Sequence, residues 1–197
     1  LQHHLLRRTL PSGKFLHHVK DDTSHPLAES PLLDLPPVDI GRQVHDLLPP
    51  GVYVLKQSIF GFFLEKTADF DLPPKMYGDV QRDADRVIRT YKDRDNSTGI
   101  LLTGERGSGK TMLAKKIAMD GIAQGIPCIL INQEFHGDQF NDFISDIEQD
   151  CFVLFDEFEK TYSAEAQESI LTLLDGTVKT KKLFMLTSNS KYKINEL

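Results

Sequence analysis

The stretch Gly104-Glu105-Arg106-Gly107-Ser108-Gly109-Lys110-Thr111 decides the fold of this chain. It fits the pattern G-x-x-x-x-G-K-[ST], whose glycines let the backbone wrap so that several N–H groups point toward bound phosphates. Lys110 would add a positive charge on the β- and γ-phosphates, and the Thr111 hydroxyl would bind Mg²⁺. We therefore predict that this whole loop, together with Met112 after it, binds a nucleoside triphosphate.

Such a loop needs a buried strand before it and a helix after it. Residues 98–103 form a short apolar run that predicts the strand. In residues 111–119, Leu113 and Ile117 recur at i,i+4, which is typical of a helix. This helix would present its positive N-terminal end to the same phosphates. The context therefore favours a phosphate-binding loop over a chance glycine-rich turn.

Strands and helices alternate beyond the loop. The apolar runs predict strands at 126–132, 151–155 and 182–187, and the periodic segments predict helices at 140–147 and 164–174. This alternation indicates an α/β fold with a parallel sheet and right-handed crossovers.

Two carboxylates, Asp156 and Glu157, follow the apolar strand at 151–155. Ligands of parallel α/β sheets bind beyond the carboxyl ends of the strands. Asp156 is then placed to hold the water shell of Mg²⁺ opposite Thr111. Glu157 is placed to orient or deprotonate a water that attacks the γ-phosphate. An Asp-Glu pair after a strand is common by itself, but its spacing from Lys110 favours the catalytic interpretation over a polar loop.

Another strand ends in Thr187-Ser188-Asn189. If this strand lies between the other two, the Asn189 amide could donate to the γ-phosphate and accept from the attacking water. Ser188 or Thr187 could share that role. Such a strand end is by itself only a turn signal.

These motifs together resemble the core of AAA+ ATPases over about residues 70–197. The phosphate loop corresponds to Walker A, Asp156-Glu157 to Walker B, and Leu173-Leu174-Asp175-Gly176 favours AAA proper. The resemblance implies a three-layer P-loop NTPase fold with sheet order 5-1-4-3-2, and it implies Asn189 as sensor 1. It also implies that Tyr77 and Gly78 line the adenine pocket of ATP. In its overall sequence features the chain is similar to AAA ATPases encoded by large bacteriophages.

The chain departs from this family at its end. The resemblance implies an arginine finger, a fifth strand and a helical lid after Asn189, whereas no arginine follows Arg106 and the sequence ends at Leu197. We therefore expect a fragment that lacks the fifth strand, leaves the phosphate-loop strand at a sheet edge, and hydrolyses ATP poorly by itself. A second departure is the short interval after the second strand. Phe135 is its only candidate for an aromatic residue that grips a threaded polypeptide, and packing is the alternative.

Composition limits the partners. The 197 residues carry a formal net charge of −6, which gives no electrostatic support for a nucleic-acid partner. Arg82, Arg86 and Arg89 recur at helical spacing, and nearby aspartates favour a solvated face. No run approaches the roughly 20 apolar residues that cross a bilayer. Cys128 and Cys151 each begin a predicted buried strand, which indicates reduced thiols in a cytoplasmic protein.

We divide the chain into a Pro- and His-rich, partly ordered arm (1–50), a small β-element (51–72) and the nucleotide-binding domain (73–197). The arm holds little periodicity apart from a possible short helix at 40–48. Two apolar runs around Gln57-Ser58 predict a hairpin in the β-element, where the aromatic residues favour core packing over a docking surface.

The resulting expectation is Mg²⁺-dependent ATP hydrolysis by a ring ATPase, hexameric when complete. It would remodel or translocate a macromolecule, with protein favoured over nucleic acid. The alternative is a switch or loader in which nucleotide binding controls assembly. A P-loop kinase is disfavoured because Glu157 suits water activation.

Overall fold

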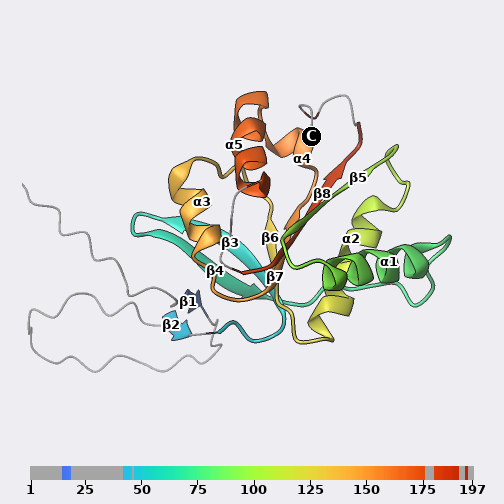
Figure 1. The fold of residues 1–197 in the computed structure, drawn as a ribbon, viewed down its shortest axis with the longest axis horizontal. Helices are drawn as coiled ribbons and strands as arrows, with labels where there is room; N and C mark the ends of the chain where they lie inside the picture. The colour runs from blue at the N-terminus through green and yellow to red at the C-terminus, as the bar shows by residue number, and fades with distance from the viewer. Residues whose placement is uncertain (1–14, 19–41, 46, 176–179, 191–193, 195–197) are drawn as a thin grey trace, which may run out of the picture.

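The computed structural model describes residues 15–18, 42–45, 47–175, 180–190 and 194. Its strands form one sheet with helices on both faces (Figure 1). The three-layer α/β architecture expected from the alternation of strands and helices is therefore confirmed.

The described strands form one eight-stranded sheet in the order β2-β1-β4-β3-β6-β7-β8-β5. Its central strands are β5 (Thr98–Thr103), β6 (Cys128–Ile131), β7 (Cys151–Phe155) and β8 (Lys182–Ser188). They pair in parallel, β5 with β8, β8 with β7 and β7 with β6. This reproduces the 1-4-3-2 part of the expected order. Within the described residues, β5 forms one edge of the sheet.

A hairpin continues the sheet beyond β6. It consists of β3 (Val52–Ser58) and β4 (Gly61–Thr67), which pair antiparallel. Because β3 also pairs in parallel with β6, this hairpin and the nucleotide-binding domain share one sheet. The separation of residues 51–72 as a domain stays a prediction. At the hairpin tip, Ile59 and Phe60 are exposed, so for them the expected core packing is wrong.

Two short strands precede this hairpin, β1 (Phe15–His18) and β2 (Arg42–His45). They pair antiparallel with each other, and β1 pairs in parallel with β4. The short helix expected at 40–48 is therefore wrong: Arg42–His45 is a strand, because pairing with β1 overrides a weak local preference. Most of the expected arm lies outside the described residues.

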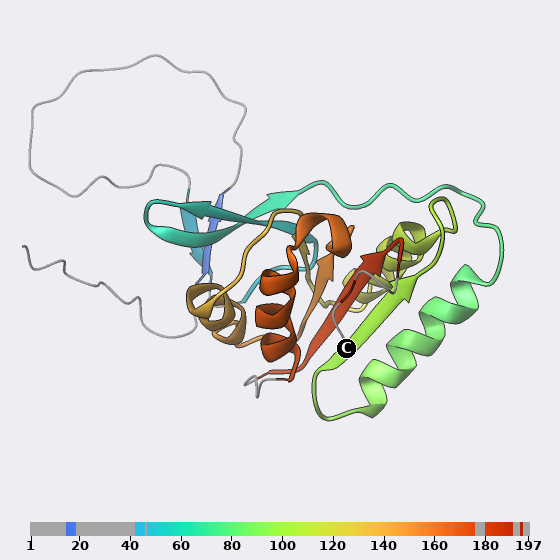
Figure 2. The same cartoon turned by 90° about the horizontal axis from the view of Figure 1, so that it is seen from above.

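Helices α1 (Val80–Asp93) and α2 (Lys110–Ile122) cover one face of the sheet, as Figure 2 shows from above. Successive strand residues point to opposite faces. Phe152 and Leu154 of β7 therefore pack with α1 and α2. The Tyr91 ring of α1 meets the Phe152 ring edge-on at 5.2 Å between centroids.

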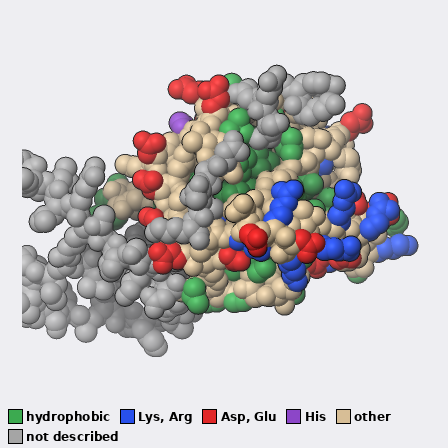
Figure 3. Space-filling model, viewed as in Figure 1, with side chains coloured by type: hydrophobic (Ala, Val, Ile, Leu, Met, Phe, Trp, Pro, Cys, Tyr) green, Lys and Arg blue, Asp and Glu red, His purple; other side chains and the backbone are tan. Residues whose placement is uncertain are grey.

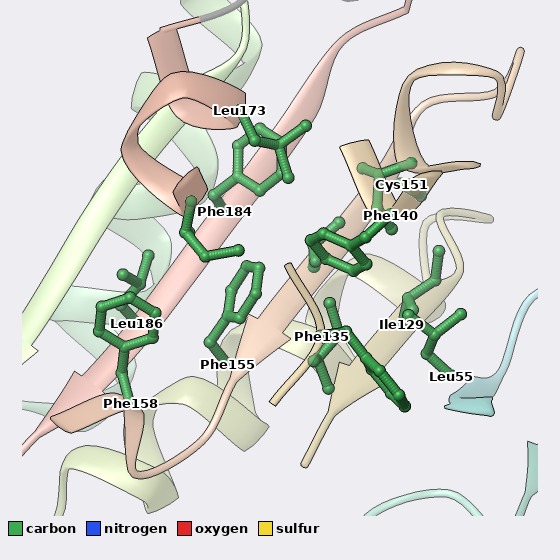
Figure 4. Packing of buried hydrophobic residues seen from close by; sticks show 14 of the residues in the cluster. Leu55, Ile129, Phe135, Phe140, Cys151, Phe155, Phe158, Leu173, Phe184 and Leu186 are labelled. Carbon is green, nitrogen blue, oxygen red and sulfur yellow. The ribbon is translucent and has the colours of Figure 1, made fainter. Parts of the chain in front are cut away.

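The opposite face carries α3 (Asp138–Ser145), α4 (Phe158–Thr161) and α5 (Ala164–Asp175). Their apolar side chains pack on Val153 and Phe155 of β7, in the core that Figure 4 shows. Phe135 belongs to this core: it is 7% exposed, and its ring lies 5.3 Å from that of Phe62. This burial agrees with packing, one of the two interpretations of Phe135, and the gripping role stays an untested prediction.

Charged side chains are unevenly distributed over the surface. Lys and Arg gather over the side formed by α1 and α2, interspersed with acidic residues (Figure 3). There Arg82 pairs with Asp79 at 2.7 Å, and its side chain is largely exposed. These pairs agree with a solvated helix face. In the described part of the chain, no helix is long and apolar enough to span a bilayer.

Candidate functional site

The candidate site lies where β7 and β8 end and α2 begins. A cavity of about 260 Å³ opens there. It is lined by Arg106, Gly107, Gly109, Lys110, Thr111, Met112, Glu157, Thr187, Ser188 and Asn189. Segments that are far apart in the sequence meet because the carboxyl ends of parallel strands share one edge of the sheet. The loop, the Glu157 carboxylate and the Asn189 amide are thus brought together.

The glycine-rich loop turns back on its own lysine. Gly107 and Gly109 adopt positive φ angles of 83° and 89°, which side-chain-bearing residues rarely adopt. The Lys110 ammonium donates to the carbonyl oxygens of Gly104 and Glu105, both at 2.7 Å. Its charge is therefore held at the centre of the loop by neutral acceptors.

Helix α2 begins in this loop with Gly109 as N-cap, and no side chain caps it. The first N–H groups of a helix have no partners within the helix, and the helix dipole places partial positive charge there. The N–H groups of Lys110, Thr111 and Met112 therefore favour an anion at the cavity. Together with the lysine, this arrangement suits phosphate.

Asp156 joins α2 to the sheet. Its Oδ1 accepts hydrogen bonds from Thr111 Oγ1 at 3.1 Å and from Thr187 Oγ1 at 2.7 Å. Adjacent oxygen ligands of octahedral Mg²⁺ lie about 3 Å apart, because each metal–oxygen distance is about 2.1 Å. The spacing of Thr111 Oγ1 and Asp156 Oδ1 and their hard oxygen chemistry therefore fit this ion.

Glu157 has an unusual backbone. Its φ of 51° makes it the one non-glycine residue with positive φ among those that the structure describes. Its N–H donates to Thr187 Oγ1 at 2.8 Å, and it is the N-cap of α4. The Glu157 carboxylate is about half exposed and forms an ion pair with Lys160. Positive φ at such a residue indicates a conformation that its surroundings impose.

Asn189 is held by α4. Its backbone N–H and its Nδ2 both donate to Glu159 Oε1, at 2.9 and 2.8 Å. Of the two alternatives at this strand end, the Thr187 hydroxyl is occupied by Asp156, and Ser188 Oγ donates to Ser190 O at 2.9 Å. The Asn189 amide is thus held by the Glu159 carboxylate.

Tyr77 and Gly78 line a neighbouring cavity of about 420 Å³ with Val80 and Met112. The Tyr77 side chain is 80% exposed, and the Lys75 ammonium lies 5.2 Å from its ring centroid. Because Met112 also lines the first cavity, the two cavities adjoin. The expected adenine-side residues therefore lie next to the phosphate loop.

Three contacts escaped the sequence analysis. They are the bridge that Thr187 makes between Asp156 and Glu157, the Glu159–Asn189 hydrogen bonds and the Lys160–Glu157 ion pair. Thr187 carried a signal, since it ends a buried strand in a polar side chain. Glu159 and Lys160 carried none, because charged residues in a short helix are ordinary.

The comparison with known families agrees with this geometry. Residues 100–197 match the family model of the ATPase family associated with various cellular activities (AAA). No curated protein matched the sequence. The matched segment contains Lys110, Asp156, Glu157 and Asn189. Gly176, in the Leu-Leu-Asp-Gly element, lies outside the described residues.

Proposed function

Because residues 100–197 form an AAA-type ATPase core, we propose that this chain binds Mg²⁺–ATP and hydrolyses its terminal phosphoanhydride bond. One observation carries the proposal: the Thr111–Asp156 oxygen pair, 3.1 Å apart, adjoins the cavity that Lys110, Glu157 and Asn189 line. The groups that would bind phosphate, bind the metal ion and activate water thus lie next to one another.

The loop would bind the triphosphate. Phosphate oxygens are charged acceptors, so they would replace the carbonyls of Gly104 and Glu105 as partners of the Lys110 ammonium. The uncapped N–H groups of α2 would donate to the same phosphates. Tyr77 and Gly78 would contact the adenine in the adjoining cavity.

Thr111 and Asp156 would hold Mg²⁺, with Thr187 fixing the Asp156 carboxylate. When bound, the ion neutralises charge on the β- and γ-phosphates. Glu157 would accept a proton from water while the water oxygen bonds to the γ-phosphorus and the bond to the β,γ-bridging oxygen breaks. Its exposed pair with Lys160 is weak in water and would not prevent this.

Nucleotide binding and turnover test the proposal. We expect a fluorescent ATP analogue to bind in the presence of Mg²⁺ and Lys110→Ala to abolish this binding. Lys115→Ala is the matched control, because Lys115 lies on the same helix with its ammonium 5.5 Å from the Phe70 ring centroid. Glu157→Gln should bind nucleotide but release at least tenfold less phosphate. Equal binding by the Lys110 and Lys115 variants would contradict the assignment.

We further propose that this ATPase assembles into a ring, most simply a hexamer, and acts in the cytoplasm on a macromolecule. The buried free thiols of Cys128 and Cys151 support a reducing compartment. The net charge of −6 favours protein over nucleic acid as substrate.

The alternative of a switch or loader is supported by the burial of Phe135, because a buried ring is less suited to gripping a polypeptide. Mass photometry with and without ATP separates the two. If the chain assembles when ATP binds, and Glu157→Gln assembles in the same way without hydrolysing ATP, the result supports the switch.

A further inference from the structure

Glu159 holds Asn189 at two points with a single oxygen. Its Oε1 accepts from the Asn189 backbone N–H at 2.9 Å and from Nδ2 at 2.8 Å. Asn189 also lines the cavity beside Glu157. Both the backbone N–H and the side-chain amide of Asn189, the residue directly after β8, are thus held by α4.

This contact decides which way the Asn189 amide faces. An ionised carboxylate only accepts hydrogen bonds, so the NH₂ group must face Glu159. Burial by itself raises the pKa of Glu159, but hydrogen bonds outweigh this and leave the pKa below its ordinary value of 4.5; the largest come from Asn189, followed by those from the Glu159 backbone and the Ser188 side chain. Glu159 is therefore ionised at neutral pH. The Asn189 Oδ1 and its second N–H stay free of this bond.

Helix α4 is itself held firmly. Phe158 is fully buried, and its ring stacks on that of Tyr162 with centroids 4.8 Å apart. It also meets the Phe155 ring edge-on. Because α4 begins directly after Glu157, this one anchored turn carries both the proposed base and Glu159.

The ionised Glu159 side chain includes one oxygen in an unfavourable environment. Its Oε2 is buried and has no hydrogen-bond partner among the residues that the structure describes. A buried polar atom without a partner is destabilising, because it has lost its hydrogen bonds to water. A purely structural acceptor could be a neutral amide. A charged acceptor instead makes stronger hydrogen bonds and restricts the amide that donates to it.

From this geometry we propose that Glu159 is a positioning residue, which orients the Asn189 amide toward the attacking water and γ-phosphate. The inference rests on the proposed ATPase function and deepens it. Among the described residues that line the cavity, Asn189 is present and Glu159 is not. Glu159 acts through Asn189, so its loss should lower kcat and leave the dissociation constant of ATP unchanged.

The first test needs no nucleotide. The side-chain NH₂ signals of Asn189, assigned by NMR with Asn189→Ala, should shift as acid protonates Glu159, with a midpoint below 4.5. Glu159→Gln keeps the shape and should abolish this titration. Glu165→Gln, an exposed position in the first turn of α5, is the control and should preserve it. Signals that do not respond to Glu159 would overturn the proposal, and the wild-type titration decides this even if a variant fails to fold.

The second test is a double-mutant cycle on phosphate release. Glu159→Ala should lower kcat about tenfold to a hundredfold, the range typical of groups that orient an active-site residue. In an Asn189→Ala background the same change should have no further effect, and Glu159→Gln should recover part of the rate. Independent, multiplying losses would overturn the inference. Failure of the wild-type chain to bind ATP would contradict the proposed function and leave the NMR result standing.

Discussion

Thr187 Oγ1 lies 2.7 Å from Asp156 Oδ1, and the same hydroxyl accepts a hydrogen bond from the backbone N–H of Glu157. Thr187 is the next-to-last residue of β8 and is 2% exposed, whereas the two acidic residues follow β7. One hydroxyl therefore sets the position of both carboxylate residues of the candidate site.

Replacing this hydroxyl should weaken the site and the fold together. Thr187→Val removes a donor to a charged oxygen and leaves the Glu157 N–H without its acceptor. We expect a loss of about 1–3 kcal/mol in the free energy of unfolding. We also expect the affinity for Mg²⁺ in the presence of nucleotide to fall about tenfold. Urea unfolding and Mg²⁺ titrations measure the two effects.

The matched control for this variant is Thr98→Val. Thr98 Oγ1 is also buried, but it has no hydrogen-bond partner among the described residues. Removing it should leave stability unchanged or raise it by about 1 kcal/mol. Equal losses in the two variants would show that the Thr187 hydrogen bonds contribute nothing specific.

Gly121 allows α2 to approach β7 closely. A Cβ atom at this position would lie 2.2 Å from Cε2 of the Phe152 ring. Gly121→Ala should therefore lower the free energy of unfolding by about 1–3 kcal/mol through overpacking. Gly99→Ala in β5 is the control, since a Cβ there has no neighbour within 4 Å. Chemical denaturation should separate the two, and a stable Gly121→Ala would argue against this close contact.

The two cysteines should be unreactive in the folded protein. Cys128 and Cys151 are fully buried. Burial raises the pKa of Cys151 to about 11 and also raises the pKa of Cys128. The thiolate is the reactive form, so a thiol reagent at pH 8 should label neither cysteine in native protein and both in guanidinium chloride. Rapid labelling of either thiol in the native protein would contradict the burial of Cys128 and Cys151, the first residues of β6 and β7.

Glu159 should contribute to stability in a defined pH range. Because the pKa of Glu159 is lower in the folded state than its ordinary value of 4.5, its contribution is present above that value. It is lost as pH falls through the lower, folded-state pKa. Urea unfolding from pH 6 to pH 3 should thus show a shallower decline for Glu159→Gln than for wild type. Glu165→Gln should follow wild type, and identical curves for all three would refute the shift.

Local patterns predicted much of the central fold. The phosphate loop, the parallel pairing of the central strands and the start of α5 at Ala164 were accessible from apolar runs and helical spacing. The order of β5, β8, β7 and β6 followed from the resemblance to AAA+ ATPases. Helix α3 was predicted at 140–147 but occupies Asp138–Ser145. Ends of helices depend on a few competing hydrogen bonds and are poorly encoded in periodicity.

Contacts between residues far apart in the sequence decided what local patterns left wrong or open. Arg42–His45 was expected in a helix but pairs with β1, and Phe135, for which the sequence left gripping and packing open, packs against Phe62. In each case the deciding partner is remote in the sequence. Propensity describes a residue and its neighbours, whereas strand pairing and burial depend on what the folded chain brings near.

The sequence by itself determined a glycine-rich loop with Lys110 and Thr111 between a strand and a helix, and it placed Asp156 and Glu157 beyond a buried strand, because loop, strand and helix are encoded by adjacent residues. Only the tertiary structure decided how these groups are held. Thr187 joins Asp156 to Glu157, and Glu159 faces Asn189, across two neighbouring strands and a short helix. Hydrogen bonds require donor and acceptor within about 3 Å, and that proximity exists only after the parallel strands have aligned their carboxyl ends.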